Sequence, residues 1–163
     1  MNYNELTNEG DVKWSEVASG GIRLDLVPPS GTFTPILGAT ITDPTVTYGT
    51  RQGVWARVGS LVFLYVRVDW TAISDGEGDV RIRGLDALPT PNTSFVQILP
   101  GRTTGVTFFD GRSAVYATFA SAGVLRVAAY GSGVGTQIIS LAHLGSSGSL
   151  LFQGAYLTNA PLP

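Results

Sequence analysis

The stretch between residues 53 and 71 constrains the fold most strongly. Two extended runs, Gly53–Val58 and Leu61–Thr71, flank the pair Gly59-Ser60, and a glycine at the first central position of a two-residue loop suits a type II′ turn. One face of the second run is apolar at a period of two, which fits a strand and does not fit a helix. That face consists of Val62, Leu64, Val66, Val68 and Trp70. We therefore predict a β-hairpin with this face in the core.

The other face of the second run changes character along its length. It begins apolar with Leu61, Phe63 and Tyr65 and ends charged with Arg67 and Asp69. Such a face is covered only in part, by a second sheet or by a neighbouring subunit. Charged residues make up 13% of the chain, about half the share usual in soluble domains. We expect part of the surface to be buried between subunits, because symmetric self-association is the commonest way to cover it.

The remainder of the chain predicts short strands joined by frequent turns. Its 21 glycines and 9 prolines, without any long segment of 3.6-residue period, favour an all-β domain. About eight to eleven strands at this spacing indicate an antiparallel β-sandwich, jelly-roll-like in layout. Beyond the hairpin, strands are expected at Thr32–Leu37, Thr45–Tyr48, Val80–Ile82, Phe95–Leu99, Gly105–Phe109, Ser113–Phe119, Val124–Tyr130, Thr136–Leu141 and Leu150–Leu157. Turns are expected at Pro100-Gly101 and Asp110-Gly111, and a flexible connection at Gly131–Gly135.

The first thirty residues differ from the rest of the chain. Residues 1–30 carry a net charge of −3, whereas residues 31–163 sum to +1. Several apolar residues make the segment too hydrophobic for a purely flexible tail. We interpret it as an attachment segment that orders on a partner or between subunits, with a frayed terminus as the alternative. Pro28-Pro29-Ser30-Gly31 then forms a stiff linker to a head domain at residues 31–163.

Composition excludes several classes of function. The net charge of −2 and the single lysine, Lys13, leave no basic stripe for nucleic acid. The absence of cysteine removes disulfides, thiolate catalysis and zinc–sulfur sites. The N-terminus lacks a secretory signal, and the apolar runs are far shorter than the ~20 residues of a membrane helix. We expect synthesis in a cytoplasm and no membrane insertion.

No set of catalytic residues is visible. His143 is the only histidine, and no Gly-x-Ser-x-Gly motif accompanies it, so we expect a structural role at a loop edge. Most aspartates that could form a glycosidase pair lie beside glycines at turns, where Asp is favoured for local hydrogen bonding. We therefore predict that the chain is not an enzyme and needs no cofactor.

Two other patterns could bind ligands. The carboxylates of Asp75, Glu77 and Asp79 alternate in a glycine-rich loop and could converge on Ca²⁺, but the other ligands of an EF-hand are missing, so a solvated turn without a metal is preferred. Exposed aromatic rings could stack on sugars, although aromatics in alternating strands are more often core residues. The aromatic candidates are Trp55, Trp70, Tyr116 and Tyr130.

Five short motifs resemble the C-terminal head domain of many tailed-phage fibres and related minor structural proteins. They lie at Gly31–Pro35, Val46–Tyr48, Trp55–Gly59, Gly78–Leu85 and Gly154–Tyr156, and the resemblance covers about residues 31–158. It implies a trimeric β-sandwich head whose distal loops touch the host surface, often a polysaccharide. The chain departs from this family in lacking a long shaft and in its short N-terminal segment, which favours a short, self-contained fibre or spike.

These observations predict a homotrimeric, non-enzymatic phage short tail fibre or spike that recognises a host-surface glycan. Residues 1–30 would attach it to other virion proteins of the tail, baseplate or capsid, through Trp14, Ile22, Leu24 and Leu26. The candidate receptor-binding residues are Trp70, Asp75, Glu77, Asp110, Arg112 and Tyr130. One alternative is a baseplate or capsid decoration protein without a receptor role, and another is a polysaccharide depolymerase.

Overall fold

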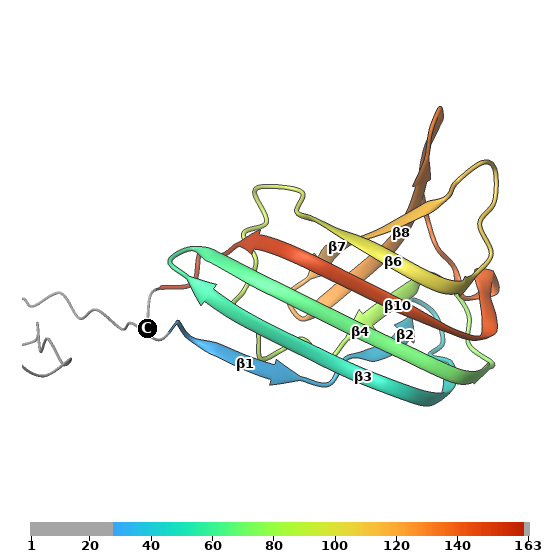
Figure 1. The fold of residues 1–163 in the computed structure, drawn as a ribbon, viewed down its shortest axis with the longest axis horizontal. Coiled ribbons are helices and arrows are strands. Elements are labelled where there is room, and N and C mark those ends of the chain that lie inside the picture. Colours follow the sequence, from blue (N-terminus) through green and yellow to red (C-terminus); the bar gives the residue numbers. More distant parts are fainter. Residues whose placement is uncertain (1–27, 162–163) are drawn as a thin grey trace, which may run out of the picture.

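The computed structural model describes residues 28–161, which form one antiparallel sheet of ten strands (Figure 1). The elements in chain order are β1 (Ser30–Phe33), β2 (Ile36–Ala39), β3 (Thr45–Val58), β4 (Leu61–Ser74), β5 (Val80–Arg83), β6 (Ile98–Val106), β7 (Ala114–Ser121), β8 (Val124–Gly131), β9 (Val134–Ile138), the 3₁₀ turn η3 (Leu141–His143) and β10 (Leu144–Leu157). The prediction of an all-β, antiparallel fold is confirmed. Within these residues, no helix is long and apolar enough to span a membrane.

The sheet curls so that its two halves face each other in a sandwich-like arrangement. The strand order is β1-β3-β4-β10-β6-β7-β8-β5-β2. The remaining strand, β9, lies off this path and pairs with β8. In Figure 1 the long strands β3, β4, β10 and β6 lie side by side, with β7, β8 and β2 behind them. The edge strands β1 and β2 are consecutive in the chain, separated only by Thr34-Pro35, so the two ends of the curled sheet are brought together.

The hairpin predicted from the sequence is present and is longer than expected. Val58 pairs with Leu61, and Gly59 has a φ of 59°, as a type II′ turn requires at its first central position. The Thr45–Tyr48 run joins the first arm through an irregularity of register between Thr47 and Arg51, so β3 continues without a turn. β3 and β4 therefore span the whole length of the sandwich.

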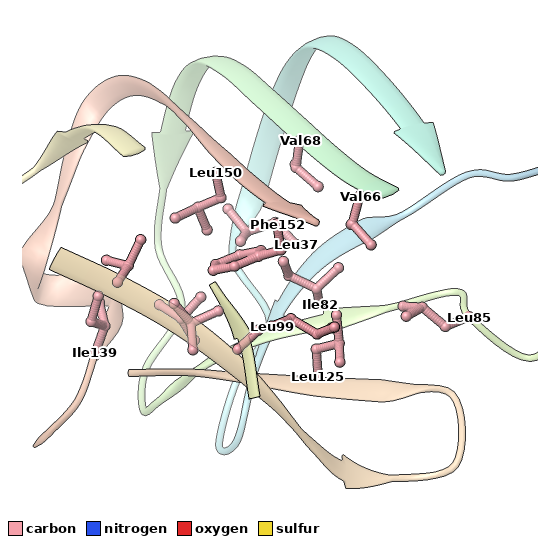
Figure 2. Packing of buried hydrophobic residues seen from close by; sticks show 14 of the residues in the cluster. Leu37, Val66, Val68, Ile82, Leu85, Leu99, Leu125, Ile139, Leu150 and Phe152 are labelled. Carbon is pink, nitrogen blue, oxygen red and sulfur yellow. The ribbon is translucent and has the colours of Figure 1, made fainter. Parts of the chain in front are cut away.

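The core fills the inside of the curl. The inner face of β4 is the one that alternation predicts, and its valines Val62, Val66 and Val68 are completely buried. Figure 2 shows residues of β4 and β10 packed against residues from the opposite half of the sheet. The labelled residues that meet in this way are Val66, Val68, Leu150, Phe152, Ile82, Leu99 and Leu125. Each such side chain contributes about 1.5–3 kcal/mol by leaving water, which makes this interior the main source of stability.

Inner-face aromatic rings lie on glycines of the neighbouring strand. Four aromatic–glycine pairs face each other directly in the register: Trp70 with Gly148, Phe152 with Gly101, Trp55 with Gly31 and Phe33 with Gly53. A Cβ on Gly148 would lie 2.6 Å from the Trp70 ring, closer than real contacts allow. These glycines therefore leave room for the rings, as in designed sheets where aromatics cover strand glycines.

The prediction of a turn at Pro100-Gly101 is wrong. β6 runs straight through both residues, and the ring of Phe152 occupies the space that a side chain at position 101 would need. Gly101 thus serves packing and not chain reversal. The runs predicted at Phe95–Leu99 and Gly105–Phe109 are replaced by this one strand, which leaves Phe95 exposed in the loop before it.

Other boundaries also move. Within the run Gly131–Gly135, predicted as a flexible connection, Ser132 and Gly133 form the turn of the β8–β9 hairpin, with a φ of 74° at Gly133, and the other residues belong to the two strands. The run predicted at Thr32–Leu37 is split between β1 and β2, which pair with opposite ends of the sheet order. The break is the short segment Thr34-Pro35, where proline provides no backbone N–H for a ladder.

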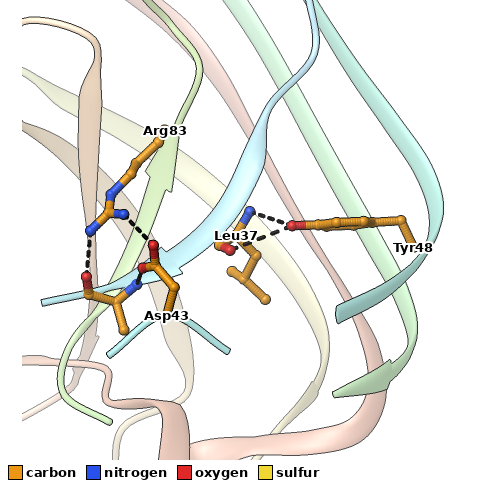
Figure 3. A network of polar contacts seen from close by, with 5 residues as sticks. Leu37, Asp43, Tyr48 and Arg83 are labelled. Carbon is orange, nitrogen blue, oxygen red and sulfur yellow. Dashed lines mark hydrogen bonds and ion pairs between the residues drawn. The ribbon is translucent and has the colours of Figure 1, made fainter. Parts of the chain in front are cut away.

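Side chains complete the closure of the sheet where no strand ladder does (Figure 3). The Tyr48 hydroxyl on β3 accepts a hydrogen bond from the Leu37 N–H of β2 at 3.0 Å and donates to the Leu37 carbonyl at 3.4 Å. Arg83 donates to Asp43 and to the Ala39 carbonyl, each at 2.6 Å. These bonds hold β2 against β3 and β5, because they satisfy backbone groups that would otherwise lack partners at the edge.

Candidate receptor-binding surface

Four connections meet at the end of the sandwich opposite residues 28 and 161, where the described chain begins and ends, and we call it the loop end (Figure 1). They are residues 40–44, 75–79, 107–113 and 139–143. Backbone hydrogen bonds join them: Glu77 donates to Thr42 at 2.9 Å, Leu141 to Gly78 at 3.0 Å and Thr107 to His143 at 2.8 Å. The connections therefore form one linked surface.

A hollow of about 420 Å³ lies within the loop end, between Ile41, the segment 75–78 and the segment 140–142. Asp75 and Glu77 are exposed beside it. Asp75 adopts a left-handed φ of 60°, and its carboxylate accepts a hydrogen bond from the Ser74 hydroxyl at 3.0 Å. Among residues 28–161, no three histidine or carboxylate side chains converge as a metal site would require.

The turn predicted at Asp110-Gly111 is confirmed. Both residues have positive φ, 51° and 74°, and the Arg112 N–H donates to the Phe109 carbonyl at 3.1 Å, as in a type I′ turn. The Arg112 guanidinium lies 4.9 Å from the centre of the Phe109 ring and donates to the Gly135 carbonyl at 3.1 Å. Only 10% of the Arg112 side chain is exposed, against 78% for Asp110, so Asp110 is the more accessible of the two.

His143 lies at the edge of a loop, as predicted. Its ring is 4.2 Å from that of Phe109, and Nδ1 lies 2.8 Å from the Ser140 hydroxyl. Within the described part of the chain, no carboxylate is hydrogen bonded to this imidazole. The contacts of His143 join the segments 107–113 and 139–143 of the loop end.

The predicted receptor-binding residues are thus divided between three places. Asp75, Glu77, Asp110 and Arg112 lie at the loop end, and Tyr130 is 44% exposed on the outer face of β8. Trp70, however, is only 2% exposed, and its indole N–H donates to the Gly145 carbonyl at 2.9 Å inside the fold. A ring held in the core cannot reach a receptor, so Trp70 belongs to the packing and not to the binding surface.

A second surface lies outside β3, β4 and β10, and we call it the apolar outer face. It consists of Val54, Ala56, Val58, Leu61, Phe63, Ala155 and Leu157, which are neighbours in the register of the three strands. Phe63 is 48% exposed, and a shallow groove of about 590 Å³ runs beside it. The Arg67–Asp69 ion pair, at 2.7 Å, marks the end of this face on β4, and it raises the pKa of Arg67 through hydrogen bonding and charge.

Sequence alternation revealed only the β4 part of the apolar outer face. Val54 and Val58 on β3 and Leu157 on β10 complete it, and their place depends on strand register. A contiguous apolar area of this kind is uncommon on monomeric proteins.

The apolar outer face reaches the end where both described termini lie, which we call the terminal end (Figure 1). Arg57 joins the two termini there. Its backbone N–H donates to the Pro29 carbonyl at 2.8 Å, and its guanidinium donates to the carbonyls of Ala160 at 2.6 Å and Pro161 at 2.8 Å. The predicted attachment residues, Trp14, Ile22, Leu24 and Leu26, lie outside the described residues.

The described residues therefore form an all-β domain with a linked loop end and an apolar outer face. No protein-family model and no curated protein sequence matches the chain. Among solved structures, the fold is similar to part of the crystal structure of the Dettilon tailspike protein (gp208), with a TM-score of 0.63 and 19% sequence identity. The match covers 78% of this chain and 23% of that tailspike, so the shared part is the fold of one section of a longer protein.

Proposed function

We propose that this chain is a non-enzymatic virion component of a tailed phage, a homotrimeric short tail fibre or spike that recognises a host-surface polysaccharide. The observation that carries the proposal is the separation of the two ends. The termini and the apolar outer face lie at one end, and the linked loops lie at the other. The fold shared with a tailspike protein supports a place on the phage tail.

Self-association uses the apolar outer face in this proposal. Three copies that bury Val58, Leu61 and Phe63 against one another would also bring their three N-terminal segments together, because the chain enters at Pro29 beside Arg57. The loop ends would then point in the same direction. Weak contacts with a repeating glycan are multiplied when three loop ends bind at once.

Attachment to the virion is assigned to residues 1–30. Deleting residues 1–27 is expected to abolish incorporation into phage particles while leaving the head folded, because the shortened chain keeps β1 and the Pro29 carbonyl that accepts a hydrogen bond from the Arg57 N–H. The measurement is the copy number of the protein in purified particles, with circular dichroism of the truncated protein as the control. Wild-type copy number after the deletion would contradict this division of roles.

Recognition of the host is tested with labelled full-length protein on a panel of bacterial strains and on their purified surface polysaccharides. We expect binding to strains that share one polysaccharide and loss of binding when that polysaccharide is removed. The double variant Asp75→Asn, Asp110→Asn should weaken binding about tenfold, since it removes charged acceptors for glycan hydroxyls at the loop end. Ser60→Ala, in the hairpin turn at the terminal end, is the matched control.

The alternative roles predict different results in this assay. Binding to none of the strains or polysaccharides would contradict the receptor role and leave a baseplate or capsid decoration protein. Release of reducing ends from a bound polysaccharide would identify a depolymerase and overturn the non-enzymatic part of the proposal.

A further inference from the structure

Two arginines face each other on the outside of the sheet where β5 and β8 pair. Arg81 lies directly opposite Arg126 in the register of these strands. Directly opposite residues share a face, with Cβ atoms about 5 Å apart, and like charges in such a pair are destabilising. An anion bound between the two guanidinium groups would relieve this repulsion.

The protein's own carboxylates neutralise this cluster only in part. Arg83, two residues along β5, is paired with Asp43 at 2.6 Å, and Arg81 has Asp79 at 3.7 Å. Across residues 28–161, Arg126 forms no ion pair, and its one side-chain hydrogen bond is a contact of 3.4 Å to the Thr118 hydroxyl. Arg126 is therefore the cation that remains available to a ligand.

Burial makes the charge on Arg81 more costly. Loss of hydration lowers the pKa of Arg81, Asp79 opposes this effect, and the charges of Arg126 and Arg83 lower the pKa further. Only 15% of the Arg81 side chain is exposed. Because partly buried charges are less screened by water and salt, an anion at this place is bound more strongly than at a fully exposed arginine.

Two tyrosines lie beside the arginine pair on the same outer face. Tyr116 on β7 is directly opposite Ala128, which is two residues from Arg126 in one direction and from Tyr130 in the other. The rings of Tyr116 and Tyr130 are 5.7 Å apart and inclined by 56°. Ala128 is only 3% exposed, so the larger side chains around it lie close together. Tyrosine faces stack on sugar rings, and guanidinium groups bind carboxylates and phosphates with two parallel hydrogen bonds.

We propose that this surface binds the acidic groups of a host-surface glycan, carboxylate or phosphate, through Arg81 and Arg126, while Tyr116 and Tyr130 contact the sugar rings. We call this surface of four residues the arginine–tyrosine face; the Thr118 hydroxyl that accepts the hydrogen bond from Arg126 belongs to a buried residue. The proposal rests on the proposed glycan-binding function and names the glycan class. Asp75, Glu77 and Asp110 at the loop end would accept hydrogen bonds from hydroxyls of the same glycan, whereas the arginine–tyrosine face supplies the cations for its acidic groups.

The test uses full-length protein on three matrices at low salt: immobilised polygalacturonate, phosphocellulose and neutral dextran. The chain has a net charge of −2, so retention on an anionic matrix requires a local cationic site. We expect retention on at least one anionic matrix, release by salt, and none on dextran. Stronger retention on polygalacturonate assigns the site to carboxylates, and stronger retention on phosphocellulose assigns it to phosphates. Passage through both anionic matrices without delay would overturn the proposal.

Single substitutions test whether matrix retention depends on the arginine–tyrosine face. Arg126→Gln should weaken retention about tenfold, because it removes a charge-assisted pair of hydrogen bonds and breaks no ion pair within the protein. Arg126→Lys should restore part of it, since lysine keeps the charge but loses the planar fork. Arg51→Gln removes the same charge from an exposed position on β3, in the other half of the sheet, and should retain wild-type behaviour. Equal losses for Arg126→Gln and Arg51→Gln would mean non-specific attraction and would contradict the proposal.

Matrix retention is independent of the trimer, the virion and the host strain. If host cells bind the protein but Arg126→Gln leaves matrix retention unchanged, the arginine–tyrosine face is refuted and the receptor role stands. If the anionic matrices retain the wild type through Arg126 but no strain is bound, the proposed function fails and the acidic-ligand site remains.

Discussion

The two faces of strand β4 carry side chains of the same kind with opposite surroundings. On the inner face, Val62, Val66 and Val68 are fully buried in the core. On the outer face, Phe63 and Leu61 are 48% and 37% exposed, although they are at least as apolar as the valines. Hydrophobicity alone therefore does not determine which face of a strand becomes core.

The two faces of β4 differ in what covers them. The inner face is covered by the opposite half of the curled sheet, which comes from the same chain. Nothing in residues 28–161 covers the apolar outer face. If a second copy covers it, substitutions on the inner face should change the stability of each subunit, whereas substitutions on the outer face should change the number of subunits.

The largest effect is expected inside the curl. Phe152→Ala should lower the free energy of unfolding by about 3–5 kcal/mol, because it leaves a cavity and uncovers Gly101 beneath the ring. Urea unfolding followed by tryptophan fluorescence measures this change. Phe63→Ala, the matched variant on the outer face, should change the unfolding of a dissociated subunit by no more than about 0.5 kcal/mol.

For the outer face, the expected effect is a change in the number of subunits, and the native mass from light scattering on a sizing column measures it. The wild-type protein should have a mass of about 51 kDa, three copies of the 17.1-kDa chain, and Phe63→Asp should shift it towards 17.1 kDa by placing a charge in the interface. Thr71→Asp, at the far end of the same strand face, should leave the mass unchanged. A wild-type mass of one chain would contradict a free-standing trimer, and an unchanged mass for Phe63→Asp would move the interface to another surface.

Features that depend on neighbours in sequence were predictable. The β3–β4 hairpin, its type II′ turn and the buried face of β4 follow from a local period of two and one glycine. The Asp110-Gly111 turn follows from the same kind of local chemistry. The N-terminal attachment segment also had a local signal, but its role stays a prediction.

Features that depend on register were not predictable. The pair Pro100-Gly101 predicts a turn from its local sequence. In the structure Gly101 instead makes room for the ring of Phe152, a residue far away in the chain. Arg81 and Arg126 are likewise brought together only by the pairing of β5 with β8. The hydrogen bonds that link the loop end join positions from four separate connections, so the sequence suggested some of its residues but not their grouping.

For Trp70, two local signals in the sequence predicted different roles. Its alternation with Val66 and Val68 predicted a core residue, while its aromatic ring suggested a sugar contact. The structure favours the periodic pattern, because Gly148 on the neighbouring strand leaves space for the ring inside the fold. Periodicity was therefore a better guide to this side chain than its chemistry.

The smallest effect is expected for Tyr156 on β10, where the contribution of a single buried hydroxyl on the inner face can be measured. Tyr156 lies on the inner face opposite Val62, and its hydroxyl donates to the Pro89 carbonyl at 2.7 Å, whereas its neighbour Leu157 lies on the outer face. Tyr156→Phe keeps the ring but leaves this carbonyl without its partner, so it should cost about 1 kcal/mol at neutral pH. Urea unfolding midpoints at pH ~7 measure this cost.

The pH dependence of the same variant isolates the hydroxyl. Burial raises the pKa of Tyr156, and the charge of Arg57 opposes this only in part. The folded pKa thus lies above the unfolded value of about 10, so the contribution of the neutral hydroxyl is complete below pH ~10 and is lost as the pH rises above it. Wild type should lose stability above pH ~10 more steeply than Tyr156→Phe. Parallel curves for wild type and Tyr156→Phe would show that the inner face tolerates a charged oxygen at this position, and the contrast between the two faces would then hold for apolar groups alone.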